Sequence, residues 1–237
     1  MNLPTVLEML KAGVHFGHQA SRRHPKMDPF IFTKRNGVHI IDLEKTKEKL
    51  EATLAAVKKM AAEGKVILFV TTKPQAKEIV KEAAQNCGMP YLVDRWLGGL
   101  LTNFSEIKRL IDKYNRLKEE KATGELEKYT KKEQLQFTRE LEKMEEKLAG
   151  LSNLSKLPDV VFIPALQREK TALEEAKKMK IAIVGVTDTN ANPDDTDHFI
   201  PANDDAVNAI KMIVGLVGEA IKEGKAEQVK IAGQEKK

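Results

Sequence analysis

The sequence predicts a doubly wound α/β fold, in which helices cover both faces of a mainly parallel sheet. Short, almost continuously apolar runs at 66–70, 159–163 and 181–186 are typical of strands buried on both faces. Amphipathic stretches with helical periodicity lie between and after these runs. Strands that alternate with helices favour parallel pairing, because each crossover returns the chain to the same end of the sheet.

The elements follow in order along the chain. A short helix is expected over 5–11, and the dipeptide Asn36-Gly37 predicts a tight hairpin turn between apolar residues at 30–32 and 38–41. The remaining predicted helices cover 43–61, 74–88, 168–179 and 204–222, and two further short strands are expected at 90–93 and 199–200. The polar tail at 224–237 is expected to be frayed and flexible.

A highly charged insertion interrupts this alternation. Of the 44 residues from 106 to 149, 23 are charged, 12 of them basic and 11 acidic. Two apolar stripes run through the segment, formed by Ile107, Leu110, Ile111, Tyr114 and Leu117 and by Phe137, Leu141, Met144, Leu148 and Leu151. The second stripe has heptad spacing, and Thr130 with Glu133 forms a capping box that starts a new helix. We therefore predict an antiparallel coiled-coil hairpin at 105–151, inserted into an α/β domain made of 1–104 and 152–223.

Composition excludes several classes of protein. The 237 residues carry 40 Lys and Arg against 35 Asp and Glu, a net charge of +5. The longest run without a charge, 83–93, is too short to span a membrane, which takes about 20 residues. A single cysteine excludes a disulfide framework and a cysteine-based zinc finger. The first residues lack a signal-peptide core, so a cytoplasmic protein is expected.

Catalytic and cofactor motifs are missing from the sequence. No glycine-rich nucleotide loop follows the strand at 66–70, no serine lies in a nucleophile elbow, and Cys87 lies in an apolar context. We therefore expect neither an enzyme nor a bound cofactor. The pair Gly98-Gly99 either presents backbone N–H groups to an anion or makes a tight turn.

Two groups of residues are candidates for metal binding. Asp188, His198, Asp204 and Asp205 follow or belong to predicted strands, and they are candidate ligands of a weakly bound divalent ion. The alternative for residues 203–205 is helix capping. His15 and His18 would share a helical face, but a zinc site needs four ligands, so packing or RNA contact is favoured for them.

Positive charge is concentrated at the N-terminus. Residues 1–40 hold six basic residues, two acidic residues and four of the five histidines. Such a segment is what contact with nucleic-acid phosphates requires. An ordinary basic surface loop has the same composition, and the residues alone do not separate the two.

Several ordered strings carry a resemblance to a known family. They are Ala12–Gln19, Pro25–Met27, Arg35–Gly37, His39–Leu43, Arg95–Phe104, Asp188–Asn190 and Asn203–Ala206. Over about residues 3–222 the chain resembles the bacterial ribosomal protein S2 family of the small subunit. The resemblance implies a flavodoxin- or Rossmann-like domain with an inserted coiled-coil hairpin, and a structural, non-enzymatic role in translation.

The resemblance also implies partners. These are small-subunit ribosomal RNA and neighbouring ribosomal proteins, including ribosomal protein S1, which a member of this family helps to seat. The implied RNA-binding residues are Arg22, Arg23, His24, Lys26, Lys34, Arg35, Arg95, Trp96, Asn103, Lys108 and Arg109. The alternative is a nucleotide- or metabolite-binding α/β protein whose coiled coil docks a partner.

Overall fold

The computed structural model describes residues 3–234 and contains two sheets. The larger sheet has five parallel strands in the order β5-β4-β6-β7-β8. Its strands are β4 (Ile67–Val70), β5 (Tyr91–Leu92), β6 (Val160–Ile163), β7 (Ala182–Thr187) and β8 (His198–Pro201). All five agree with predicted strands, so the predicted parallel sheet is confirmed.

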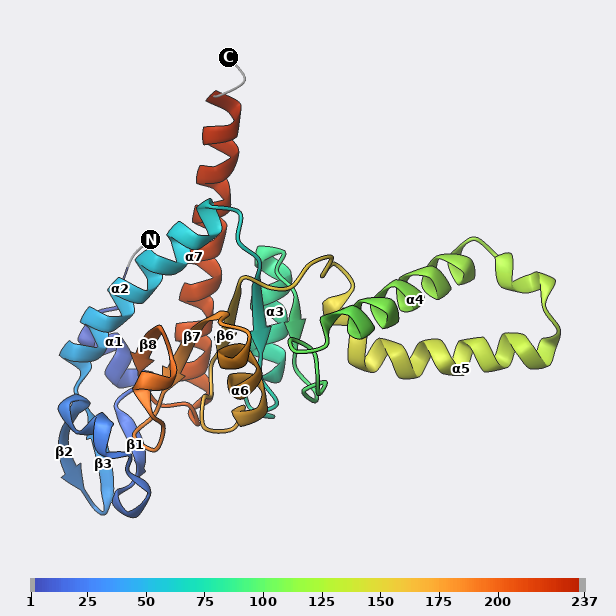
Figure 1. The fold of residues 1–237 in the computed structure, drawn as a ribbon. Helices are drawn as coiled ribbons and strands as arrows, with labels where there is room; N and C mark the ends of the chain where they lie inside the picture. The colour runs from blue at the N-terminus through green and yellow to red at the C-terminus, as the bar shows by residue number, and fades with distance from the viewer. Residues whose placement is uncertain (1–2, 235–237) are drawn as a thin grey trace.

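Helices cover both faces of this sheet (Figure 1). One core packs beneath α1 (Val6–Lys11), α2 (Leu43–Ala62), α3 (Lys77–Cys87) and α7 (Val207–Gln234). The other core packs against α6 (Lys170–Lys178) and the start of α4 (Phe104–Ala122). Alternate residues of β4 divide between them, because Phe69 belongs to the first core and Leu68 to the second. The doubly wound architecture is therefore as predicted.

The smaller sheet is built from the basic N-terminal segment. Its strands β1 (Phe16–Gln19), β2 (Ile31–Arg35) and β3 (Val38–Ile41) pair antiparallel in the order β1-β3-β2. Two 3-10 turns, η1 (Ala20–Arg22) and η2 (Pro25–Phe30), connect β1 to β2. Asn36 and Gly37 have φ angles of 50° and 80°, so the predicted hairpin turn is confirmed. The helical face expected for His15 and His18 is wrong, because β1 pairs with β3 there.

The charged insertion forms a helical arm. After α4 come η3 (Glu125–Lys128), α5 (Lys131–Leu148) and η4 (Ala149–Leu151). Figure 1 shows α4 and α5 extending away from the sheet, close together at its edge and further apart toward the tip of the arm. The Thr130 capping box starts α5 as predicted. Tyr114 and Leu148 are buried in the second core, so the arm shares a core with the sheet. Leu110, expected in the first stripe, is exposed.

The last helix runs further than the sequence indicates. The sequence predicts a frayed tail over 224–237, whereas α7 continues to Gln234. Gly224 lies inside α7, and a Cβ there would overlap the carbonyl oxygen of Lys58. Glycine at this position lets α7 approach α2 closely, and Lys58 then bridges Glu227 at 2.6 Å. Residues 235–237 lie outside the described residues. Within residues 3–234, no helix is long and apolar enough to cross a membrane.

Candidate nucleic-acid interface

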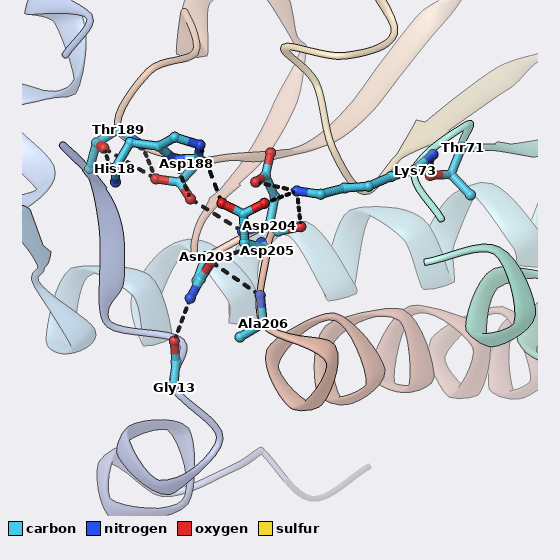
Figure 2. A network of polar contacts seen from close by, with 10 residues as sticks. All are labelled: Gly13, His18, Thr71, Lys73, Asp188, Thr189, Asn203, Asp204, Asp205 and Ala206. Carbon is cyan, nitrogen blue, oxygen red and sulfur yellow. Dashed lines mark hydrogen bonds and ion pairs between the residues drawn. The ribbon is translucent and has the colours of Figure 1, made fainter. Parts of the chain in front are cut away.

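A buried polar cluster lies where three strands of the large sheet end (Figure 2). Lys73 follows β4, Asp188 follows β7, and Asp204 and Asp205 follow β8. The Nζ atom of Lys73 lies 2.7 Å from Oδ1 of Asp204 and 2.7 Å from Oδ1 of Asp205, and it also donates to the Asp204 carbonyl. Lys73 and Asp204 are both buried, so this ion pair is largely shielded from solvent.

His18 of β1 completes the cluster from the small sheet. Its Nδ1 lies 3.1 Å from Oδ2 of Asp188, and its Nε2 lies 3.3 Å from Oδ2 of Asp205. The hydrogen bond to Asp188 raises the pKa of His18, although partial burial opposes this. Burial and the neighbouring Asp188 raise the pKa of Asp204. The His18 imidazole and the Lys73 ammonium group thus face three carboxyl groups.

The structure brings together three of the four predicted metal ligands. Asp188, Asp204 and Asp205 join His18 in a group whose ligand atoms all lie within 4.8 Å of one another. His198 is not among them, because it begins β8 and pairs in register with Val184, at the far end of the strand from the cluster. From the sequence, His18 was considered for metal binding only together with His15, because nothing in its local pattern indicates contact with aspartates so distant along the chain. Asn203 Oδ1 accepts the N–H of Asp205 at 2.8 Å in the turn that precedes α7, which begins at Val207.

Thr189 fixes the path of the N-terminal segment. Its hydroxyl accepts the N–H of His18 at 2.9 Å, and its carbonyl accepts the N–H of His24 at 2.8 Å. The chain passes so close that a Cβ on Gly17 would lie 2.5 Å from the Thr189 methyl carbon. This explains why glycine occupies position 17.

Asn203 and Asp194 add further anchors to the same segment. The Asn203 side chain donates to the Gly13 carbonyl at 2.9 Å, and its backbone N–H donates to the Val14 carbonyl at 3.0 Å. Lys26 forms an ion pair with Asp194 in η5 (Pro193–Asp195). Residues 13–26 are therefore held by the loops that follow β7 and β8, which fixes the position of the basic residues between the anchors.

Some predicted RNA-binding side chains of this segment have partners within the protein, and others have none among the described residues. Arg23 pairs with Asp28 at 2.9 Å, and His24 Nδ1 accepts the N–H of Lys26 at 3.3 Å. Arg22, Lys34 and Arg35 are exposed and make no ion pair within residues 3–234. These three cations are therefore free to meet an external anion.

The small sheet carries a positive field that acts on His39 of β3. Burial lowers the pKa of this side chain, and the charges of Arg23 and Lys34 lower it further. Arg23 precedes η2 and Lys34 lies on β2, so two cations that are separated in the sequence both lie near His39. The positive charge inferred from composition is thus concentrated in space.

The other predicted RNA-binding residues lie on a separate surface. Arg95, Trp96 and Asn103 lie in the loop between β5 and α4, and Lys108 and Arg109 belong to α4. Figure 1 shows this region on the opposite side of the large sheet from β1, β2 and β3. Lys108 lies 3.4 Å from Asp112, and Arg109 lies 2.7 Å from Glu106, so both cations have partners within the helix.

Glu175 of α6 fills the anion position in that loop. Its carboxylate accepts the Trp96 indole N–H at 2.9 Å and the backbone N–H of Gly99 at 2.8 Å. The N–H groups of Leu101 and Thr102 donate to its other oxygen. Burial opposes the charge, but these hydrogen bonds keep the pKa of Glu175 below its usual value. Gly99 therefore presents its N–H group to an internal carboxylate, and Trp96 is held as part of the fold.

A second internal carboxylate lies where such folds bind nucleotides. The strand order changes direction at β4, so the crevice between the ends of β4 and β6 is the expected ligand position. Buried Glu169 accepts the Thr72 hydroxyl there at 2.8 Å, and it also accepts the Thr72 backbone N–H. Thr72 and Glu169 at this crevice are hydrogen-bonded to each other. This arrangement gives no support to the nucleotide-binding alternative.

Fold and site together define the class of protein: an α/β protein that presents cations on a small N-terminal sheet. The family model for "Ribosomal protein S2" matches residues 9–224. The chain belongs to the ribosomal protein S2 family, whose members are structural proteins and not enzymes.

Curated relatives agree with this assignment over almost the whole chain. The "Small ribosomal subunit protein uS2" of Geotalea uraniireducens is 48% identical over 228 residues, covering 96% of this chain and 89% of the relative. The protein of the same name from Coprothermobacter proteolyticus is 46% identical over 235 residues, covering 99% and 88%.

Proposed function

We propose that this chain is a structural constituent of the small ribosomal subunit and binds ribosomal RNA through its N-terminal sheet. The carrying observation is that Arg22, Lys34 and Arg35 are exposed and, within residues 3–234, free of ion pairs on a segment anchored by Thr189 and Asn203. A rigid scaffold lets cations meet phosphates with little loss of conformational freedom. As a ribosomal protein, the chain works in the cytoplasm.

The contacts proposed at this sheet are to the phosphate backbone. Arginine can bridge two phosphate oxygens, and lysine supplies a point charge. Such contacts position a protein on RNA without reading its sequence. Arg23, His24 and Lys26 belong to the same surface. Arg23 and Lys26 pair with Asp28 and Asp194, which are exposed carboxylates that compete with phosphate.

The loop and helix on the opposite side of the molecule provide a second proposed RNA contact. Its exposed cations are Arg95 and Arg109, and Lys108 and Asn103 lie beside them on the same stretch of chain. Two surfaces on opposite sides of one sheet would let the protein bridge separate parts of the RNA. The role proposed for Trp96 is to hold this loop through Glu175, instead of stacking on a base.

We propose that the helical arm is an antiparallel coiled coil that docks on a neighbouring component of the subunit. Leu141 and Leu148 of the predicted seam are buried, and Lys113 of α4 pairs with Glu140 of α5 across the arm. By resemblance to its family, the protein also helps to seat ribosomal protein S1. This part of the proposal is supported by family membership alone.

The polar cluster is proposed as a weak divalent-cation site. One imidazole nitrogen and three carboxylates suit zinc in type and number. Lys73 already pairs with both Asp204 and Asp205, so an ion must compete with its ammonium group. Calorimetric titration with zinc chloride should give weak binding that His18→Gln abolishes and His198→Gln preserves. Equal binding by the wild type and His18→Gln would remove this site from consideration.

Sedimentation tests the main proposal. In a sucrose gradient of cell lysate, the protein should travel with the small ribosomal subunit at low salt and leave it at high salt. The salt effect follows from counterion release at the phosphates. Recovery of the protein free in the supernatant with a bound nucleotide would instead support the nucleotide-binding alternative.

A further inference from the structure

A β-bulge on β2 exposes the ring of Phe32. Ile31 lies opposite Ile41 and Thr33 lies opposite Ile40, so two steps along β2 match one step along β3. Phe32 is the extra residue of this bulge. This residue is 74% exposed, the largest value among the exposed large hydrophobic residues that the structure describes. Bulges commonly redirect a side chain beside a functional site.

The surroundings of Phe32 are cationic. It lies on the outer strand of the order β1-β3-β2, and Lys34 and Arg35 follow it on the same strand. Neither cation makes an ion pair in the described part of the chain, and Lys34 contributes to the field that lowers the pKa of His39. An exposed aromatic face beside unpaired cations is how proteins bind unpaired nucleotides.

Other aromatic rings near the proposed RNA surfaces are already engaged. Trp96 donates its indole N–H to Glu175 and packs against the second core. The ring of Phe16 lies 4.0 Å from that of His15, and the ring of Phe30 lies 5.1 Å from that of Phe199. Phe32 has no ring contact with another aromatic residue among the described ones. Its face is therefore open to an external partner.

We propose that Phe32 stacks on an unpaired base of the small-subunit ribosomal RNA, while Lys34 and Arg35 hold the adjacent phosphates. The inference rests on the proposed RNA-binding role of the N-terminal sheet and adds a base contact to it. Stacking accepts every base, because each base has a π face, so this contact orders one nucleotide without selecting its identity.

Substitutions at position 32 test the proposal on two probes: small subunits stripped of this protein by high salt, and deproteinised small-subunit RNA. Phe32→Ala should weaken binding to both by about 5- to 150-fold. Phe32→Trp should retain binding, and Phe32→Leu, which is apolar but has no ring, should bind as poorly as Phe32→Ala. Because stacking releases no counterions, the salt dependence of Phe32→Ala should match the wild type. The double variant Lys34→Ala with Arg35→Ala should instead reduce the salt dependence of binding, because it removes two phosphate contacts.

Three outcomes would overturn the inference. Wild-type affinity of Phe32→Ala for both probes would show that the ring makes no contact. A weakening with stripped subunits but none with RNA would show that the ring contacts a protein. Full binding by Phe32→Leu would show that apolar area suffices. If Arg22→Ala with Arg23→Ala still reduces the salt dependence in these cases, RNA binding by the sheet stands without the base contact. Urea unfolding should be unchanged in all Phe32 variants, because the ring is exposed.

Discussion

The imidazole of His18 lies 3.1 Å from the carboxylate of Asp188, joining the small N-terminal sheet to the end of strand β7. Beside this contact, Thr189 receives the backbone N–H of His18. The two interactions fasten the basic segment to the large sheet. The position of the proposed RNA-binding surface therefore depends on residues near the other end of the chain.

The pH dependence of stability should reveal the His18 contact. Its pKa is raised above the ordinary value of about 6.5, so the folded state binds this proton more tightly than the unfolded state. The stabilisation is fully present below about pH 6.5 and disappears as the pH rises through the raised pKa. Urea unfolding in EDTA from pH 6 to pH 9 should show this decline in the wild type and in His198→Gln. His18→Gln should lack it, and an identical profile in that variant would contradict the assignment.

Lys73 should be essential to stability because it compensates buried Asp204. Lys73→Met leaves that carboxylate without its partner, which should cost about 3–5 kcal/mol of unfolding free energy. Adding Asp204→Asn removes the uncompensated charge and should restore part of the stability. Urea unfolding of the two single variants and the double variant measures the coupling. Simple additivity would argue against a direct ion pair.

Gly17 should tolerate no side chain while Thr189 keeps its methyl group. A Cβ at position 17 would lie 2.5 Å from that methyl carbon and 3.2 Å from the His39 carbonyl oxygen. Gly17→Ala should therefore destabilise the protein by about 1–3 kcal/mol, and Thr189→Ser should recover part of this. Gly215→Ala is the matched control, because nothing lies within 4 Å of a Cβ there. A destabilisation of the control as large as that of Gly17→Ala would rule out the steric explanation.

Glu175 should organise the loop around Trp96. Glu175→Ala would leave the N–H groups of Gly99 and Leu101 without their acceptor, at a cost of about 1–3 kcal/mol for such a group. Because Trp96 is the single tryptophan of the chain, its fluorescence should shift to the red as the indole becomes more exposed. Glu174→Ala on the same helix is the control and should leave the emission unchanged. An unshifted spectrum in Glu175→Ala would mean that the loop holds its shape by other contacts.

The sequence predicts the large sheet well because periodicity is a local property. The apolar runs at 66–70 and 181–186 indicate strands whatever their neighbours are. The positive φ values of Asn36 and Gly37 were likewise expected from that dipeptide. Strand β1 was missed because its pairing with β3 leaves no alternation of buried and exposed residues that a sequence pattern could reveal.

The site depends on long-range contacts that no local pattern contains. His198 was placed with the aspartates because it is near them in the sequence. In the structure His198 lies at the opposite end of β8 from the cluster, and His18 is the histidine that lies beside the aspartates. An anion beside Gly99 was one of two alternatives for the glycine pair, and the carboxylate found there, that of Glu175, comes from another helix. The tail from Gly224 was expected to be frayed, although Gly224 permits close packing of α7 against α2.

The salt dependence of RNA binding tests the central claim most directly. Arg22→Ala with Arg23→Ala should bind stripped small subunits more weakly. Its plot of log affinity against log salt should be shallower by roughly 0.7–0.9 for each phosphate that the variant no longer neutralises. Lys59→Ala with Lys222→Ala, which removes the same charge from α2 and α7, should keep the wild-type slope. An unchanged slope in the arginine variant, or an equal change in the lysine control, would contradict RNA binding by the N-terminal sheet.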